Sequence, residues 1–199
     1  MYRDGKIYDE IDIVIVNIFL DYGIKTFPVD VFELCKKMSV ALVPYSEFSY
    51  EERKLLMKKS NQGFFVKQSK TQPPTIYYND LLESKGAIRL TILHELKHYI
   101  FNDDNDDDDD LADYFARHFM GPIAFLILKQ LESTNEIVSF CGMSISAATN
   151  AYKNIVSRKK KYGMNLFDYE IALIEHLDPV LIEIFTGKII ETEYKSNWR

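Results

Sequence analysis

Hydrophobic residues recur three or four positions apart over most of the chain, which is the period of an amphipathic helix. This spacing predicts helices over residues 9–22, 30–38, 84–101, 109–120, 123–132, 135–141 and 144–155, and a short polar helix over 51–59. The β-branched run at 13–16 leaves a strand as the alternative within the first of these segments. Asp30 lies near the start of the predicted helix over 30–38, and Ser144 is a good N-cap for the predicted helix over 144–155. The chain is therefore predicted to be mostly helical.

Three short segments, 40–43, 63–67 and 75–78, are rich in β-branched and aromatic residues and are predicted to be strands. A proline at 44 closes the first segment, and two prolines at 73 and 74 lie in the loop between the others. Because the strands come between two groups of helices, we predict an α+β fold. In this fold a small sheet of about three strands packs on the helix over 84–101.

The length and composition fit one domain with a short appendage. The chain has 199 residues, of which 47% are hydrophobic, which is enough to bury a core. We assign residues 1–160 to a single domain that includes a helix-turn-helix-like segment near 133–157. Residues 161–199 are predicted to form a helical C-terminal appendage of unknown role, with the basic run at 158–161 as a hinge.

The acidity of the chain is local. Its net charge is −6, and seven aspartates lie between positions 103 and 110; without these seven charges the net charge is +1. The lack of a broad basic excess argues against non-specific binding to nucleic acid. Two cysteines are too few for a disulfide framework, and the longest apolar stretch, 11–20, is too short to span a bilayer. We therefore expect a cytoplasmic protein that binds neither nucleic acid nor a membrane.

The strongest chemical signal is the sequence His94-Glu95-Leu96-Lys97-His98, which fits the pattern H-E-x-x-H inside a predicted helix. Two residues four positions apart lie on one face of a helix, so both imidazoles can bind one Zn²⁺. Glu95 lies beside the first histidine, where its carboxylate can take a proton from water that the zinc activates. The pattern predicts one zinc ion per chain and Glu95 as the catalytic base.

A zinc site of this kind needs a third ligand from the protein. One scheme takes an acidic residue from the next helix, followed four positions later by an aspartate on the same face. Asp109 and Asp113 fit this scheme. Asp109 would bind zinc, and Asp113 would accept the outer N–H of His94 and so fix its tautomer. Asp110 is an alternative third ligand.

Another scheme continues the motif with a glycine at position 101 and a histidine at position 104. The chain has Phe101 and Asp104 instead, so this scheme is disfavoured, although Asp104 stays open as an oxygen ligand. His118 lies nine residues after Asp109, which is about half a turn around a helix at roughly 100° per residue. We expect His118 to point away from the metal.

The residues around the motif resemble the ImmA/IrrE family of metallo-endopeptidases. In that family an H-E-x-x-H helix is followed by a helix of the form E-x-E-A-[ND]-x-F-A-x-x-L-L-M-P. The resemblance covers roughly residues 25–157 and is carried by HELKHYIF at 94–101, Ala112-Asp113, Phe115-Ala116 and Met120-Gly121-Pro122. The chain departs from the pattern where Asp109 replaces a longer glutamate, Leu111 replaces an acidic residue, and Met-Gly-Pro replaces Leu-Met-Pro.

The resemblance implies a zincin-like fold and a zinc-dependent endopeptidase. The implied substrate is a helix-turn-helix repressor of the Xre-like type, whose cleavage relieves repression in a mobile element or a stress response. Such an enzyme also needs a donor for the tetrahedral oxyanion, and the candidates are Tyr114, Arg117, Tyr77 and Tyr78. The alternative is a metalloprotease fold that binds a repressor without cutting it. A direct DNA-binding role is disfavoured because the helix from Ser144 offers few side chains that read bases.

Overall fold

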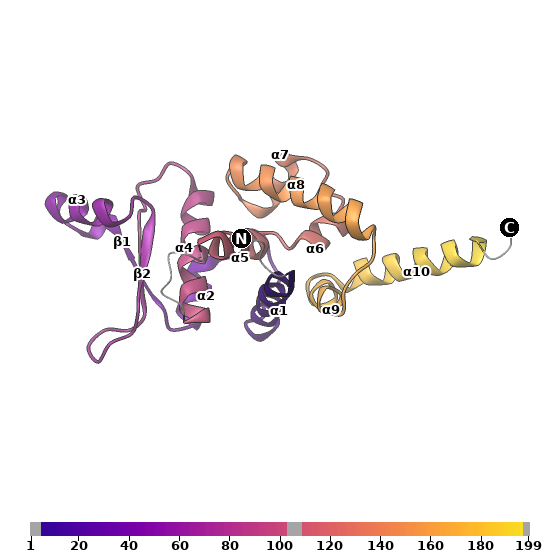
Figure 1. The fold of residues 1–199 in the computed structure, drawn as a ribbon, viewed down its shortest axis with the longest axis horizontal. Coiled ribbons are helices and arrows are strands. Elements are labelled where there is room, and N and C mark those ends of the chain that lie inside the picture. Colours follow the sequence, from indigo (N-terminus) through magenta and orange to yellow (C-terminus); the bar gives the residue numbers. More distant parts are fainter. Residues whose placement is uncertain (1–4, 103–108, 197–199) are drawn as a thin grey trace.

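The computed structural model describes residues 5–102 and 109–196 of the chain (Figure 1). The first half comprises α1 (Gly5–Asp21), α2 (Val31–Lys37), β1 (Ala41–Pro44), the 3-10 helix η1 (Tyr45–Glu47), α3 (Tyr50–Lys59), β2 (Gly63–Val66) and β3 (Thr75–Tyr78). The second half comprises α4 (Lys85–Phe101), α5 (Asp109–Met120), α6 (Ile123–Leu128), α7 (Thr134–Cys141), α8 (Ile145–Tyr162), α9 (Asp168–Leu177) and α10 (Pro179–Ser196). The β-branched run near the N-terminus is therefore helical and not a strand.

The three strands form one mixed sheet in the order β1-β3-β2. β1 runs parallel to β3, with Leu42 opposite Ile76, and β2 runs antiparallel to β3, with Phe65 opposite Ile76. Helix α4 packs against β2 and β3, at one end of the molecule (Figure 1). The predicted α+β class is thus confirmed, with a small sheet beside a mostly helical body.

Short polar side chains begin several helices at the positions that the sequence indicates. Asp30 accepts hydrogen bonds from two backbone N–H groups in the first turn of α2. Ser144 accepts one from the backbone N–H of Ala147 in α8, and Ser84 caps α4 in the same way. These side chains pair N–H groups that have no partner within their helix. They therefore explain why each helix begins where it does.

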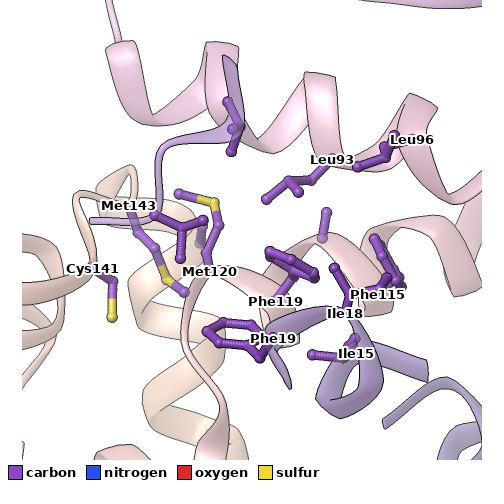
Figure 2. Packing of buried hydrophobic residues seen from close by; sticks show 14 of the residues in the cluster. Ile15, Ile18, Phe19, Leu93, Leu96, Phe115, Phe119, Met120, Cys141 and Met143 are labelled. Carbon is purple, nitrogen blue, oxygen red and sulfur yellow. The ribbon is translucent and has the colours of Figure 1, made fainter. Parts of the chain in front are cut away.

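The main hydrophobic core joins α1, α4 and α5 (Figure 2). The rings of Phe19 in α1 and Phe119 in α5 lie 4.9 Å apart, centroid to centroid. Leu93 and Leu96 of α4 have no exposed surface and belong to the same cluster. His94, Glu95 and His98 of the H-E-x-x-H motif are only partly buried, so they lie nearer the surface than these core residues.

The start of α4 packs closely on the turn between α7 and α8. A Cβ atom added at Gly86 would lie 2.6 Å from the backbone nitrogen of Ser144 and 2.7 Å from the carbonyl oxygen of Gly142. Arg89 of α4 donates a hydrogen bond to the same carbonyl. Only glycine fits at position 86 without a shift of backbone, so the helix with the motif is held against the helix-turn-helix-like segment.

The basic run Arg158–Lys161 is not a hinge, contrary to the sequence-based expectation. It lies inside α8, which continues to Tyr162. Arg158 pairs with Glu170 of α9, with Nε 3.2 Å from Oε1. Helix α9 also packs against α1, and its Leu173 belongs to the main core. The expectation is wrong because lysine and arginine are good helix formers and this run is anchored to the next helix.

Within the described residues, one stretch, Asp109–Leu128, is long and apolar enough by composition to cross a membrane. It consists of α5 and α6, which are separated at Gly121-Pro122. Because 78% of this stretch is buried in the fold, it has the properties of a core segment. It does not by itself indicate a membrane span.

Candidate metal centre

Helix α4 presents two histidines on one face. His94 and His98 are one turn apart, and their ring centroids are separated by 5.4 Å. Both are partly buried, whereas Leu96 between them is buried in the core. The spacing of the motif and the burial of the apolar face together direct both imidazoles to the same region.

Helix α5 adds a carboxylate to this region. Asp109 is the first residue of α5, and α5 packs against α4. Its Oδ1 lies 3.6 Å from Nε2 of His94. The ligand atoms of His94, His98 and Asp109 all lie within 4.8 Å of one another. The structure thus brings together three side chains from two helices in a group that can hold a metal ion.

One separation within this group can be compared with the geometry of a small divalent cation. Tetrahedral zinc with bonds of about 2.1 Å has ligand atoms about 3.4 Å apart. The separation of 3.6 Å between His94 and Asp109 is close to that value. Two imidazole nitrogens and one carboxylate oxygen leave a fourth position for water or substrate. The Asp109 side chain is 65% exposed, so the group is open to molecules that arrive from solution.

A second carboxylate holds the other nitrogen of His94. Nδ1 of His94 lies 3.0 Å from Oδ1 of Asp113, whose Oδ2 accepts a hydrogen bond from Nη1 of Arg117 at 3.1 Å. Asp113 and Arg117 follow Asp109 at intervals of four residues, so all three lie on one face of α5. When Nδ1–H donates to Asp113, the lone pair of Nε2 is directed to the group formed by His94, His98 and Asp109, which we call the metal group.

The hydrogen bond between His94 and Asp113 shifts the pKa values of the two groups in opposite directions. Burial lowers the pKa of His94, but the hydrogen bond with Asp113 and the charges of Glu95, Asp113 and Asp109 outweigh it, so the pKa lies above its ordinary value. The hydrogen bond with His94 lowers the pKa of Asp113, against the effect of burial, and Arg117 adds to this lowering. Asp113 therefore stays ionised and keeps a proton on the facing nitrogen of His94.

Glu95 lies between the histidines and strand β2. The backbone N–H of Phe65 in β2 donates a hydrogen bond to its carboxylate. Burial raises the pKa of Glu95, and the charges of His94 and His98 oppose this effect only in part. A carboxyl group with a raised pKa can accept and release a proton nearer to neutral pH, as a general base and acid must.

The structure distinguishes two of the three candidates for the third ligand. Asp109 belongs to the group with the two histidines. Asp110, the next residue of α5, is exposed and does not belong to it. Asp104 lies outside the described residues. Among the described residues, the acidic side chain that groups with the two histidines is Asp109.

Three of the four candidates for an oxyanion donor make hydrogen bonds with other residues. The hydroxyl of Tyr114 donates to an aspartate on α1 at 2.9 Å, and Arg117 donates to Asp113. The hydroxyl of Tyr77 accepts a hydrogen bond from a glutamine side chain at 3.0 Å. Burial, more than the nearby charges, raises the pKa of Tyr78. None of these contacts directs a donor to the metal group, and the hydroxyl of Tyr114 is hydrogen-bonded to α1.

Two further buried or partly buried residues, which have no signal in the sequence pattern, interact with residues of α4 and α5. Tyr45 is fully buried at the end of β1, and burial, followed by the charge of Glu95, raises its pKa to about 12. Asp12 of α1 accepts hydrogen bonds from Tyr114 and from Nδ1 of His118. Neither Tyr45 nor Asp12 belongs to a motif, because their partners are far away in the sequence.

Comparisons with known proteins add no assignment. No family model matches the chain, and no curated protein and no solved structure is similar to it. The likeness to the ImmA/IrrE family therefore rests on the motif residues alone.

Proposed function

We propose that this chain is a zinc-dependent endopeptidase with a zincin-like fold. The observation that carries the proposal is the convergence of His94, His98 and Asp109 from two helices, with their ligand atoms within 4.8 Å of one another. Glu95 lies next to this group and is partly withdrawn from water. These are the types of side chain that hydrolysis of a peptide bond at a zinc ion requires.

Zinc, when bound, supplies a Lewis acid that lowers the pKa of water and polarises the peptide carbonyl. His94, His98 and Asp109 would hold the ion, and Asp113 would keep His94 in the tautomer that binds it. Glu95 takes a proton from the attacking water and returns it to the leaving amine. The raised pKa of Glu95 makes its carboxylate a stronger base for the first of these transfers.

Strand β2 offers a place for an extended peptide beside Glu95. It lies at the edge of the sheet, where β3 is its partner on one side. An extended segment can add to such an edge as a further strand, through main-chain hydrogen bonds. Because Phe65 of β2 donates to Glu95, a peptide on this edge lies close to the catalytic carboxylate.

The proposed substrate is a helix-turn-helix repressor of the Xre-like type in the cytoplasm, as the resemblance to the ImmA/IrrE family implies. A peptide that pairs with β2 must be extended. The cut is therefore expected in a linker or an exposed loop of the repressor, where backbone is free to adopt that conformation.

The proposal is tested with Glu95→Gln and with Glu33→Gln as the matched control. Glu33 is exposed on α2. Both variants and the natural chain are loaded with zinc and incubated with a purified helix-turn-helix repressor of the Xre-like type. We expect each to retain one zinc ion, while Glu95→Gln cleaves the repressor at least about 100-fold more slowly than the other two.

Undiminished cleavage by Glu95→Gln contradicts its role as general base. If the natural chain binds zinc and the repressor but leaves the repressor intact, the protein is instead a repressor-binding protein with a metalloprotease fold. Zinc content by atomic absorption and fragment analysis by mass spectrometry distinguish these results.

A further inference from the structure

A second concave site lies on another flank of α5. This pocket has a volume of about 560 Å³ and is lined by residues of α1, α5, α6, α8 and α9, together with the α8–α9 connection. None of His94, His98 and Asp109 lines it. Its volume lies within the range of about 300–1,000 Å³ that is typical of sites for small molecules. The pocket is therefore large enough to hold one small organic ligand.

The lining of the pocket is rich in aromatic rings. Five of the lining side chains are Tyr8, Tyr114, Tyr162, Phe167 and Tyr169. The rings of Tyr8 and Tyr114 lie 4.7 Å apart, and those of Phe167 and Tyr169 are stacked at 5.6 Å. Aromatic faces from both ends of the chain thus border one space, which favours a flat ligand that can stack on them.

The charges around the pocket balance. Three lining residues are cationic and three are anionic, namely Arg117, Arg158, Lys161, Asp9, Asp12 and Glu170. Arg158 is paired with Glu170, and Asp12 is bonded to Tyr114 and His118. A site with no excess of either sign favours a ligand without net charge, because an ion would lose its hydration without a matching countercharge.

Two buried polar atoms in the lining residues lack hydrogen-bond partners among the described residues. They are Nε2 of His118 and Nη1 of Arg158, and neither is open to water. In a neutral imidazole whose Nδ1–H faces Asp12, Nε2 is an acceptor, whereas Nη1 of Arg158 is a donor. If these side chains turned toward a bound ligand, a donor of the ligand could bond to Nε2 of His118 and an acceptor to Nη1 of Arg158.

We propose that this pocket binds a flat, uncharged nitrogen heterocycle of the nucleobase or nucleoside class. Such a ligand has two faces that stack on tyrosine rings and an edge with both donors and acceptors. Arg117 lines the pocket and also donates to Asp113, which holds His94. The ligand therefore contacts a side chain that is connected to the metal group, and this regulatory connection, unlike binding itself, rests on the proposed function.

Binding is tested by calorimetry on the full chain with adenosine, inosine and uridine as probes, and with adenosine monophosphate as the charged counterpart. Ser157→Phe fills the pocket from an exposed position of α8, and Val156→Phe is the control, since Val156 is exposed on the same helix and does not line the pocket. We expect at least one nucleoside to bind one per chain, at least tenfold more weakly to Ser157→Phe, and equally well to Val156→Phe.

Absence of binding by all three nucleosides overturns the proposal, as does equal binding to Ser157→Phe. Adenosine monophosphate that binds tenfold more tightly than adenosine also overturns it, because the charge of the ligand would then be wrong. If Ser157→Phe does not fold, as judged by circular dichroism, Asn154→Phe fills the same pocket from the preceding turn of α8.

The connection to the metal group is measured by zinc titration against a competing chelator. We expect a saturating nucleoside to change the zinc dissociation constant of the natural chain at least threefold, and to leave that of Arg117→Gln unchanged. An equal constant with and without nucleoside overturns the connection. Both readouts are independent of proteolysis, so failure of the repressor to be cut leaves them interpretable.

Discussion

Two histidines of this molecule are held by aspartates in the same way, yet they lie in different surroundings. Nδ1 of His94 and Nδ1 of His118 each lie 3.0 Å from an aspartate oxygen, of Asp113 and Asp12 respectively. In the first pair, Nε2 of the histidine faces a further carboxylate and a neighbouring histidine. In the second pair, Nε2 is buried without a partner among the described residues.

The comparison shows that an aspartate–histidine pair does not define a metal site. The difference lies in what converges on the free nitrogen. At His94, the i, i+4 spacing of α4 supplies His98, and the packing of α5 supplies Asp109. At His118, the ring of Tyr114 lies with its centroid 3.7 Å from the imidazole, and His118 belongs to no group of possible metal ligands among the described residues. Convergence of ligands, and not the orientation of one imidazole, distinguishes the two places.

The largest expected effect comes from removing one histidine of each pair. His94→Ala removes one of three protein ligands, so the chain is expected to lose stoichiometric zinc. His118→Ala removes a ring that contributes no ligand to the group, so one zinc ion per chain is expected to stay bound. Atomic absorption after dialysis measures both. Equal zinc content in the two variants would remove the distinction between the sites.

The second comparison is between neighbouring aspartates of α5. Asp109→Ala is expected to lower zinc affinity by more than the 10–100-fold that is typical for loss of an outer partner of a ligand. The side chain of Asp110 is outside the group, so Asp110→Ala is expected to change the zinc affinity less than threefold. Titration with a chromophoric chelator gives both values, and a reversed order would assign the third ligand to Asp110.

The third prediction concerns the outer partner of His94. Asp113→Asn removes the carboxylate that orients the ring, so zinc affinity at pH 8 is expected to fall about 10–100-fold. The pKa of His94 lies above its ordinary value in the metal-free chain. Protons therefore begin to compete with zinc at a higher pH than they would at a histidine with an ordinary pKa.

The pH dependence has a definite sign. We expect the natural chain to retain zinc at high pH and to lose it as the pH falls through the raised pKa of His94. Asp113→Asn removes the main cause of the raised pKa, so proton competition begins at a lower pH in the variant. Half-loading is measured from pH 8 to pH 5. A midpoint that rises in the variant would contradict the assigned role of Asp113.

The smallest effect is expected at the second pair and concerns stability. Asp12→Asn weakens the hydrogen bonds to Tyr114 and His118, at a cost of about 1–3 kcal/mol in the free energy of unfolding. Glu10→Gln on the exposed side of α1 is the control and is expected to stay within about 0.5 kcal/mol of the natural chain. Urea unfolding of the zinc-free proteins checks both values, and equal stability of the two variants would show that the second pair contributes nothing.

Local signals predicted most of the elements, because they act within a few residues. The apolar period over 84–101 and the caps at Asp30 and Ser144 correspond to α4, α2 and α8. The spacing of His94 and His98 likewise predicted a shared face. The run at 158–161 was misjudged because its effect depends on Glu170, a partner in the next helix.

Contacts between distant segments could not be predicted from the pattern of hydrophobic and polar positions. Asp12 and His118 are 106 residues apart, and no periodicity indicates that α1 and α5 meet there. Tyr45 follows a proline at a strand end and shows nothing that places it near Glu95. The pocket among α1, α5, α6, α8 and α9 exists only because elements from both ends of the chain pack together.

Helix α8 touches two parts of the molecule at its opposite ends. Its N-terminal turn lies against Gly86 of α4, and Arg158, near its other end, is anchored to Glu170 of α9. Eighteen residues of helix form a rod about 27 Å long, which bends little under small loads. Helix α8 is therefore a stiff connection between α9 and the helix that carries His94 and Glu95.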